Sequence, residues 1–204
     1  MLEINKTINH INLQPTIIRE NSWWTMTDAQ LGIFEKHVKG AKFLEAFCGN
    51  GSLSEMAMEM GAISGVAFDK ESKFPQIKGV SFKSCYTKDF PVNGDKYDAL
   101  LISYPQSHNN ACSGLDKLFN ISKKVIYIGC NFDSTACGDT NFWKTMITKE
   151  VLAVEMSVRN TMIVYGDKPR NESQPGLVLW EELAGLDRSK IYNLPETPIR
   201  SGKL

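Results

Sequence analysis

The chain has 204 residues, 42% of them hydrophobic, and its 23 basic and 23 acidic side chains give a formal net charge of zero. This length favours one domain with a substantial core over two full domains. The balanced charge excludes a global basic field for nucleic acid, although a local basic patch is compatible with it. The opening residues, MLEINKTINHINLQ, lack the apolar core of a signal peptide, and no stretch approaches the roughly 18 apolar residues of a membrane span. We therefore expect a cytoplasmic protein without a membrane partner.

Residues 1–26 show no clean periodicity, but their isoleucine and leucine content is too high for a free tail. We expect an extension that packs on the domain or forms a lid. Trp23 and Trp24 are adjacent, and adjacent side chains point in different directions in any regular structure. Either both pack in the core, or one of them stacks on a base, an adenine or a partner surface.

A helix is predicted from Thr27 onward. Thr27 fits the N-cap of a capping box with Gln30 three residues later. Leucine, phenylalanine and valine follow at helical spacing up to Val38, and Gly40 suits the C-cap.

The segment KFLEAFCGNG, residues 42–51, predicts a buried strand that runs into a tight glycine turn. Its apolar run contains a single charge, Glu45. Gly49 and Gly51 let the chain turn sharply and bring bare backbone close to a ligand. Ser52 is a good N-cap for the helix that follows.

A second apolar run, residues 62–69, ends in Asp69, about 20 residues past the first glycine, where a nucleotide-binding βαβ unit carries its ribose-binding acid. Strand, turn, helix and acid together resemble the S-adenosylmethionine (SAM)-dependent methyltransferases of the Rossmann-like class I, whose first motif is E/D-x-F/L-x-G-x-G. The motif residues here are Glu45, Ala46, Phe47, Cys48, Gly49, Asn50 and Gly51. The resemblance implies SAM as cofactor. It also implies an α/β fold with a mostly parallel seven-stranded sheet of order 3-2-1-4-5-7-6 and helices on both faces.

The resemblance assigns roles to this motif. The backbone around Gly49 and Gly51 leaves room for the methionine part of SAM, with Phe47 and Asn50 beside it. Glu45 binds the amino group of the cofactor directly or through water. Asp69 accepts hydrogen bonds from the two ribose hydroxyls.

A third short strand is predicted over residues 80–85 from alternating side chains. The family's third strand ends near an acid that contacts the adenine amine. Cys85 and Tyr86 take that place here, and the nearest acid, Asp89, lies several residues further on. We expect Cys85 and Tyr86 to border the cofactor, with the adenine contact itself open.

Residues 97–103 predict a fourth, buried strand. In relatives that methylate amino groups of nucleic acids, this strand ends in a D/N/S-P-P-Y/W tetrapeptide that holds the target amine and stacks on the base. Residues 103–106 are Ser-Tyr-Pro-Gln, with tyrosine in place of one proline and no final aromatic residue. The candidate catalytic residues are Ser103, Tyr104, Pro105 and His108. His108, in the loop after this strand, is either a solvated histidine or a general base or substrate contact.

A fifth strand, residues 124–129, ends at Cys130 and Asn131. This pair resembles the site of RNA 5-methyluridine methyltransferases, in which the cysteine of a Ser-Cys-Asn-Pro motif attacks the pyrimidine ring. A nucleophilic cysteine needs thiolate character; otherwise Cys130 is a structural residue at a strand end. The five cysteines form no C-x-x-C pair and there are three histidines, so we predict reduced thiols and no metal site.

Residues 151–156 and 161–165 predict two more strands, joined by a link so short that an antiparallel hairpin is strongly favoured over a parallel crossover. Such a reversal distinguishes the methyltransferase fold from a plain dinucleotide-binding domain. We therefore predict an N-terminal extension or lid at 1–26, a SAM-binding domain at 27–166, and a polar, proline-rich C-terminal extension and tail at 167–204.

The preferred function is that of a SAM-dependent methyltransferase, in which alignment for in-line displacement supplies much of the acceleration. The acceptor stays open. A base of RNA or DNA is the first hypothesis, from the position of residues 103–105 and from the tryptophan pair, whereas a small-molecule acceptor fits the neutral charge better. The third hypothesis is a non-catalytic fold relative that binds SAM, or has lost it, and serves as a regulatory subunit.

Overall fold

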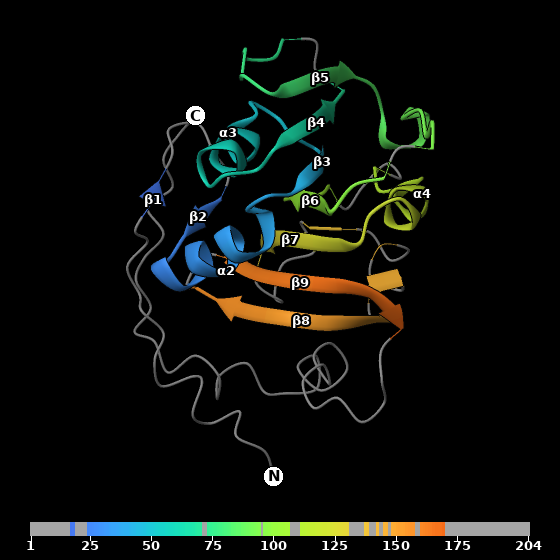
Figure 1. Ribbon diagram of the computed structural model, residues 1–204. Helices are drawn as coiled ribbons and strands as arrows, with labels where there is room; N and C mark the ends of the chain where they lie inside the picture. The colour runs from blue at the N-terminus through green and yellow to red at the C-terminus, as the bar shows by residue number, and fades with distance from the viewer. Residues whose placement is uncertain are drawn as a thin grey trace, which may run out of the picture.

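A computed structural model describes residues 17–18, 24–70, 73–94, 96–106, 111–130, 137–138, 142, 145–146, 148–157 and 160–169. Figure 1 shows a single twisted sheet as the centre of this part of the chain. Two short strands, β1 (Ile17–Ile18) and β2 (Thr25–Met26), pair with each other outside that sheet.

The central sheet has seven strands in the spatial order β5-β4-β3-β6-β7-β9-β8. They are β3 (Lys42–Ala46), β4 (Ser64–Asp69), β5 (Val80–Ser84), β6 (Ala99–Ser103), β7 (Lys124–Cys130), β8 (Lys149–Met156) and β9 (Asn160–Pro169). The first five pair in parallel, and β9 runs antiparallel to both of its neighbours, β7 and β8. Counted within the sheet, this order is 3-2-1-4-5-7-6, so the predicted topology and its terminal hairpin are confirmed.

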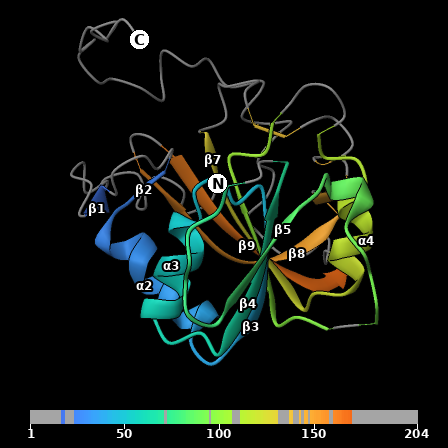
Figure 2. The same ribbon diagram turned by 90° about the horizontal axis from the view of Figure 1, so that it is seen from above.

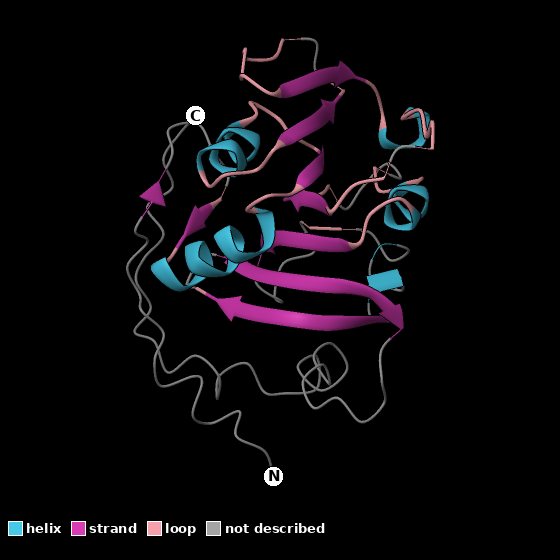
Figure 3. Cartoon of the chain, in the orientation of Figure 1, coloured by secondary structure: helices cyan, strands magenta, loops and turns pink. Residues whose placement is uncertain are grey.

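Helices cover both faces of the sheet (Figures 2 and 3). Helices α2 (Asp28–Val38) and α3 (Ser52–Glu59) lie on one face, and α4 (Leu115–Asn120) lies on the other. The α2 and α3 side chains Phe34, Leu53 and Met56 are buried against one face, and the α4 side chains Leu115 and Leu118 against the other. The apolar side chains on each face of the sheet form one cluster with the helices on that face. Burial of both clusters holds the sheet between its helices.

The capping box predicted for the first helix is present. The Thr27 hydroxyl accepts the Gln30 N–H at 3.2 Å, and the Gln30 side-chain oxygen accepts the Thr27 N–H at 3.1 Å. The helix ends at Val38 with Lys39 as its C-cap, so the predicted C-cap Gly40, with φ of 71°, lies one residue beyond the observed cap.

Two predicted boundaries were wrong, and both errors come from left-handed backbone that composition does not reveal. Strand β3 ends at Ala46 rather than running to Cys48, because Phe47 has φ of 61°. Helix α3 is capped by Gly51, with φ of 75°, so the predicted N-cap Ser52 is instead its first residue. The Asn50 side chain accepts the Ser52 N–H at 3.2 Å.

The packed unit is also wider than residues 27–166. Trp24 and Met26 are buried in the cluster that α2 and α3 cover, and β9 continues to Pro169. The end of the predicted N-terminal extension is therefore part of the core. Within the described residues, no helix has the length and apolar character needed to cross a membrane.

Candidate active site

A cavity of about 650 Å³ lies at the carboxyl ends of β3, β4, β5 and β6. Open α/β sheets bind their ligands at this edge, where the connecting loops leave a crevice. The volume falls within the roughly 300–1,000 Å³ typical of small-molecule sites. A nucleoside-sized ligand together with part of a second molecule fits such a space.

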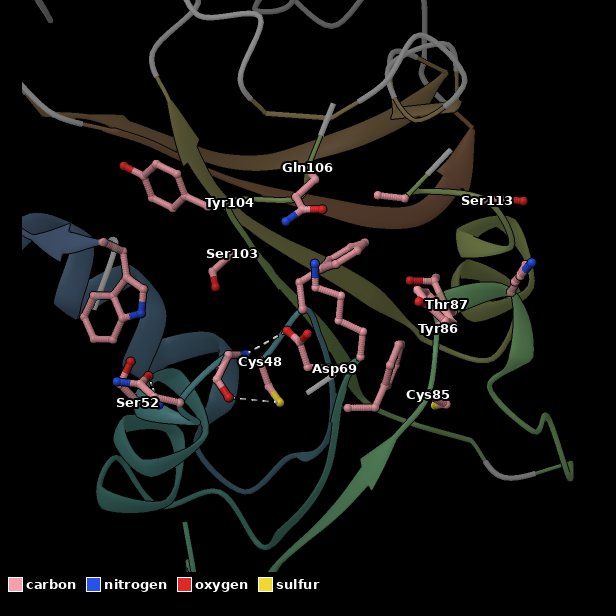
Figure 4. Close-up of a pocket in the computed structure, with 18 residues that line it drawn as sticks. Cys48, Ser52, Asp69, Cys85, Tyr86, Thr87, Ser103, Tyr104, Gln106 and Ser113 are labelled. Carbon is pink, nitrogen blue, oxygen red and sulfur yellow. Dashed lines mark hydrogen bonds between the residues drawn. The ribbon is translucent and has the colours of Figure 1, made fainter. Parts of the chain in front are cut away.

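Most of the site residues predicted from the sequence line this cavity (Figure 4). Those that line it are Phe47, Gly49, Asn50, Asp69, Cys85, Tyr86, Ser103 and Tyr104. Glu45, Gly51 and Pro105 do not line it. His108 lies outside the described residues, so its predicted role stays a prediction.

The two glycines of the turn have different surroundings. Gly49 has φ of 50°, and a Cβ built there would meet no heavy atom within 4 Å, so its backbone faces open space in the cavity wall. At Gly51, with φ of 75°, a Cβ would approach the Phe82 ring to 3.0 Å. Gly49 therefore leaves room for a ligand, whereas Gly51 lets the turn pack against β5.

Asp69 closes β4 directly beside this turn. Its Oδ2 atom accepts the Gly49 N–H at 3.0 Å, the contact drawn as a dashed line in Figure 4. Among the described residues its Oδ1 atom has no partner. One carboxylate oxygen thus holds the glycine turn while the other is available to accept hydrogen bonds from ligand hydroxyls.

Glu45 lies beneath the glycine turn and does not line the cavity. Its side chain is fully buried, Ser54 Oγ of α3 donates a hydrogen bond to its Oε2 atom, and Oε1 has no partner within the described part of the chain. Burial raises the pKa of Glu45 to about 8, with a smaller contribution from Asp69 and an opposing one from the Ser54 hydrogen bond. Glu45 thus ties β3 to α3, and its predicted contact with the cofactor's amino group, directly or through water, stays a prediction.

Among the described residues, two other than glycine have left-handed backbone, and each directly follows a central strand. Phe47 comes after β3 with φ of 61°, and Tyr104 comes after β6 with φ of 45°. Such a conformation costs about 1–3 kcal/mol and persists where the surrounding structure enforces it. The Tyr104 N–H donates to the Ile128 carbonyl oxygen at 2.8 Å, which holds this turn in place. Both strained residues line the cavity.

The thiols at the site are poor nucleophiles. Burial, followed by the neighbouring acids Glu45 and Asp69, raises the pKa of the Cys48 thiol above its usual range, and burial also raises the pKa of Cys85. Cys130 ends β7, as predicted, but its side chain lies outside the described atoms. The described residues contain no group of three or more acidic, histidine or cysteine side chains arranged to hold a metal ion.

The charged residues of the cavity lining are Asp69, the last residue of β4, Lys70, which follows it, and Lys88, which lies after β5. The lining residues Trp24, Ser103, Tyr104 and Gln106, from the N-terminal segment and the end of β6, are uncharged, and we call them the uncharged end. Ala111 and Ser113 come from the segment whose Gly114 packs against the backbone of Lys88.

Sequence reasoning missed several of these residues. Lys70 directly follows Asp69, and Gln106 is the last residue of the tetrapeptide at 103–106. Both could have been predicted as site residues from these positions. Lys88 lies in a 3₁₀ turn (Thr87–Asp89) that no local pattern announces. Trp24 had been singled out, with stacking and core packing both open. It packs in the core and borders the cavity, and stacking on a ligand stays a prediction.

No protein-family model and no curated protein sequence matches the chain. Solved structures do match. The N-methyltransferase NodS from Bradyrhizobium japonicum WM9, in complex with S-adenosyl-L-homocysteine (SAH), aligns over 71% of this chain and 85% of its own, with 10% identity and a TM-score of 0.53. The ribosomal protein L11 methylase from Lactobacillus delbrueckii subsp. bulgaricus aligns over 70% and 78%, with 13% identity and a TM-score of 0.51. A putative methyltransferase, yhhF from Escherichia coli, aligns over 71% and 83%, with 9% identity and a TM-score of 0.51.

At such low identities the likeness concerns the fold. The chain has the Rossmann-like class I methyltransferase fold.

Proposed function

We propose that the protein is a SAM-dependent methyltransferase. The observation that carries this proposal is the joint placement of Gly49 and Asp69 at one wall of the cavity. The open face of Gly49 suits the methionine part of SAM, and the Oδ1 atom of Asp69 suits the ribose hydroxyls. Cys85 and Tyr86 follow β5 and border the same end, where they would contact the adenine.

SAM supplies a methyl group already activated by a sulfonium centre. The chain's own contribution is to orient two ligands so that the acceptor atom lies in line with the methyl carbon, which accounts for much of the acceleration in such reactions. Ser103 and Tyr104, held by the strained turn after β6, are the residues we assign to acceptor orientation. No thiol of the cavity is required, in agreement with the raised pKa values of Cys48 and Cys85.

We further propose that the acceptor is an uncharged planar group, a base of RNA or DNA. The uncharged end of the cavity supports this, because a charged acceptor would lack a counter-charge among its described lining residues. Tyr104 supplies aromatic surface, and the Gln106 side chain offers both a donor and an acceptor for the edge of a base. Figure 4 shows Ser103, Tyr104 and Gln106 projecting from the same strand end.

A free heteroaromatic small molecule is the second candidate. The formal net charge of zero favours it, since such a substrate needs no extended basic surface. Both candidates would present the same kind of planar ring to the uncharged end. They differ in whether a nucleic-acid chain extends from that ring beyond the cavity.

Calorimetric titration with SAH tests the cofactor assignment. The wild-type protein should bind SAH, and Asp69→Asn should weaken binding by about 10- to 100-fold, because a hydrogen bond to a charged group contributes about 1.5–3 kcal/mol. Asp89→Asn is the matched control, since Asp89 does not line the cavity. Absence of SAH binding by the wild type, or equal affinities of wild type and Asp69→Asn, would contradict the proposal.

The acceptor is tested by methyl transfer from radiolabelled SAM to RNA and DNA oligonucleotides and to free nucleosides. Transfer to oligonucleotides that Gln106→Ala reduces would support a nucleic-acid base. Transfer to nucleosides alone would favour the small-molecule candidate. Binding of SAH without transfer to any planar acceptor would leave a regulatory SAM-binding protein as the better description.

A further inference from the structure

A network of buried polar side chains joins the start of α2 to the turn between β8 and β9. Gln30 and Asn160 are both fully buried, and Gln30 Nε2 donates to Asn160 Oδ1 at 3.0 Å. Ser157 Oγ lies 3.1 Å from the carbonyl oxygen of Asn160 and 3.1 Å from its N–H. Burying so many polar groups is costly unless each is paired, and a paired network holds one arrangement of the chain.

One bond of this network leaves the turn and reaches the N-terminal segment. Asn160 Nδ2 donates to the Thr25 carbonyl oxygen at 2.6 Å, across 135 residues of sequence. Thr25 directly follows Trp24, whose side chain is 2% exposed and lines the cavity. The network therefore holds the main chain next to a cavity-lining aromatic side chain.

The sheet register shows at which end of the cavity this attachment lies. Asn160 pairs with Cys130, the last residue of β7. Strand β7 is the neighbour of β6, whose last residue is Ser103. Both strands end at the uncharged end of the cavity, and the segment that carries Trp24 is anchored beside them.

We propose that Asn160 and Gln30 are positioning residues that hold Trp24 as a wall of the uncharged end, and that Trp24 is a specificity-determining contact for a flat, uncharged acceptor. Because only 2% of Trp24 is exposed, it bounds the cavity with the edge of a packed side chain, and a wall fixed before binding loses little conformational freedom when a planar group contacts it. The anchoring itself is independent of the proposed function, whereas the contact with an acceptor rests on it.

The anchoring is tested with a protein in which Trp24 is the only tryptophan, made by replacing Trp23, Trp143 and Trp180 with phenylalanine. Quenching of its fluorescence by acrylamide reports how well Trp24 is shielded. Asn160→Asp puts a carboxylate oxygen against the Thr25 carbonyl in place of the amide donor, so the two should repel each other. We expect the quenching constant to rise severalfold.

Two further variants make this result decisive. Gln30→Met keeps the length of the side chain and removes its donors, and it should raise the quenching constant even if Asn160→Asp folds poorly. Val164→Ala is the matched control: Val164 is buried in the same strand and makes no bond to the network. It should lower the melting temperature and leave quenching unchanged. Unchanged quenching in the folded network variants, or an equal rise in Val164→Ala, would overturn the anchoring.

The acceptor contact is tested on the same single-tryptophan protein saturated with SAH. Each of the four ribonucleosides is added, and ribose alone serves as the control. A base bound against the exposed edge of Trp24 should quench its emission, and Asn160→Asp should weaken that effect. If SAH binds and no nucleoside quenches Trp24, the acceptor contact is wrong. If SAH itself does not bind, the proposed function fails while the acrylamide result still decides the anchoring.

Discussion

Glu45 is an acid buried beneath the glycine turn, and its ionisation is coupled to stability. Burial raises the pKa of this carboxyl group from an ordinary value of 4.5 to about 8. Between these two pH values the folded chain keeps a proton that the unfolded chain has released. The free energy of unfolding should therefore fall as pH rises from about 4.5 to about 8, by up to about 1.4 kcal/mol per pH unit, and then level off.

Glu45→Gln tests this coupling because it keeps the shape of the side chain and removes its titration. Urea unfolding at several pH values should show the variant gaining stability relative to the wild type between pH 5 and 8. Glu35→Gln, which changes an exposed acid of α2, should follow the wild-type profile. Parallel profiles for the wild type and Glu45→Gln would show that this carboxyl group does not titrate as described.

At this scale the sequence predicted some positions and not others. The number of residues between the glycine turn and Asp69 is a local feature of the sequence. It predicted one site for both, and Asp69 does lie beside Gly49. The direction of the Glu45 side chain depends on Ser54, one turn into α3, and was not predicted. The main chain next to Trp24, at the Thr25 carbonyl oxygen, accepts a hydrogen bond from Asn160, far along the chain, which no local pattern encodes.

At the scale of the elements, alanine substitutions can distinguish the loss of stability caused by backbone strain from the loss of ligand contact in the turn between β3 and α3. Gly49 and Gly40 both have positive φ, 50° and 71°, and a Cβ at either would meet nothing within 4 Å. Alanine at either position should cost about 1 kcal/mol of stability through backbone strain. Only the Gly49 methyl group would enter the cavity wall.

We therefore expect Gly49→Ala to lower the affinity for SAH at least severalfold and Gly40→Ala to leave it unchanged, with similar losses of stability in both. Chemical denaturation and calorimetric titration of the two variants measure the two effects separately. Equal SAH affinities in these variants would mean that the backbone at Gly49 does not approach the cofactor.

Apolar runs located six strands of the sheet, because buried strands leave a strong local signal, and alternating side chains located the seventh, β5. Their ends were less predictable. Tyr97 was expected in the fourth strand, yet it makes only an isolated bridge with Ser122 before β6 begins at Ala99. Strand β8 contains register irregularities near Val151, which arise from its pairing with β9 and leave no mark in the sequence.

For the whole molecule, two features of the sequence were enough to predict the strand order: the short link before the last strand and the crossovers between the parallel strands. A short link can join only antiparallel neighbours, and the parallel strands before it are connected by crossovers of one hand, so few strand orders were compatible with the sequence. The part of the cavity lining around Trp24, Tyr104 and Ser113 was harder to predict. It is assembled from the N-terminal segment, the turn after β6 and the loop before α4, and these meet only in the folded chain.

The overall charge gives a prediction for the nucleic-acid candidate. The chain has no net charge, and the described lining of the cavity contains two lysines, Lys70 and Lys88. Each neutralised phosphate of a single strand contributes about 0.7 to the slope of log affinity against log salt, so two contacts predict a slope of about −1.4. Binding of a fluorescent oligonucleotide to the SAH-saturated protein, followed by anisotropy over a range of salt concentrations, measures this slope.

Replacing both Lys70 and Lys88 with methionine should bring the slope close to zero, whereas Lys36→Met, an exposed change on α2, should leave it as it is. A steep slope that survives the double replacement would place the phosphate contacts elsewhere on the protein. An affinity that does not depend on salt in the wild type would remove the electrostatic part of the nucleic-acid hypothesis. The free heteroaromatic acceptor would then be favoured, because it needs the uncharged end of the cavity and no phosphate contact.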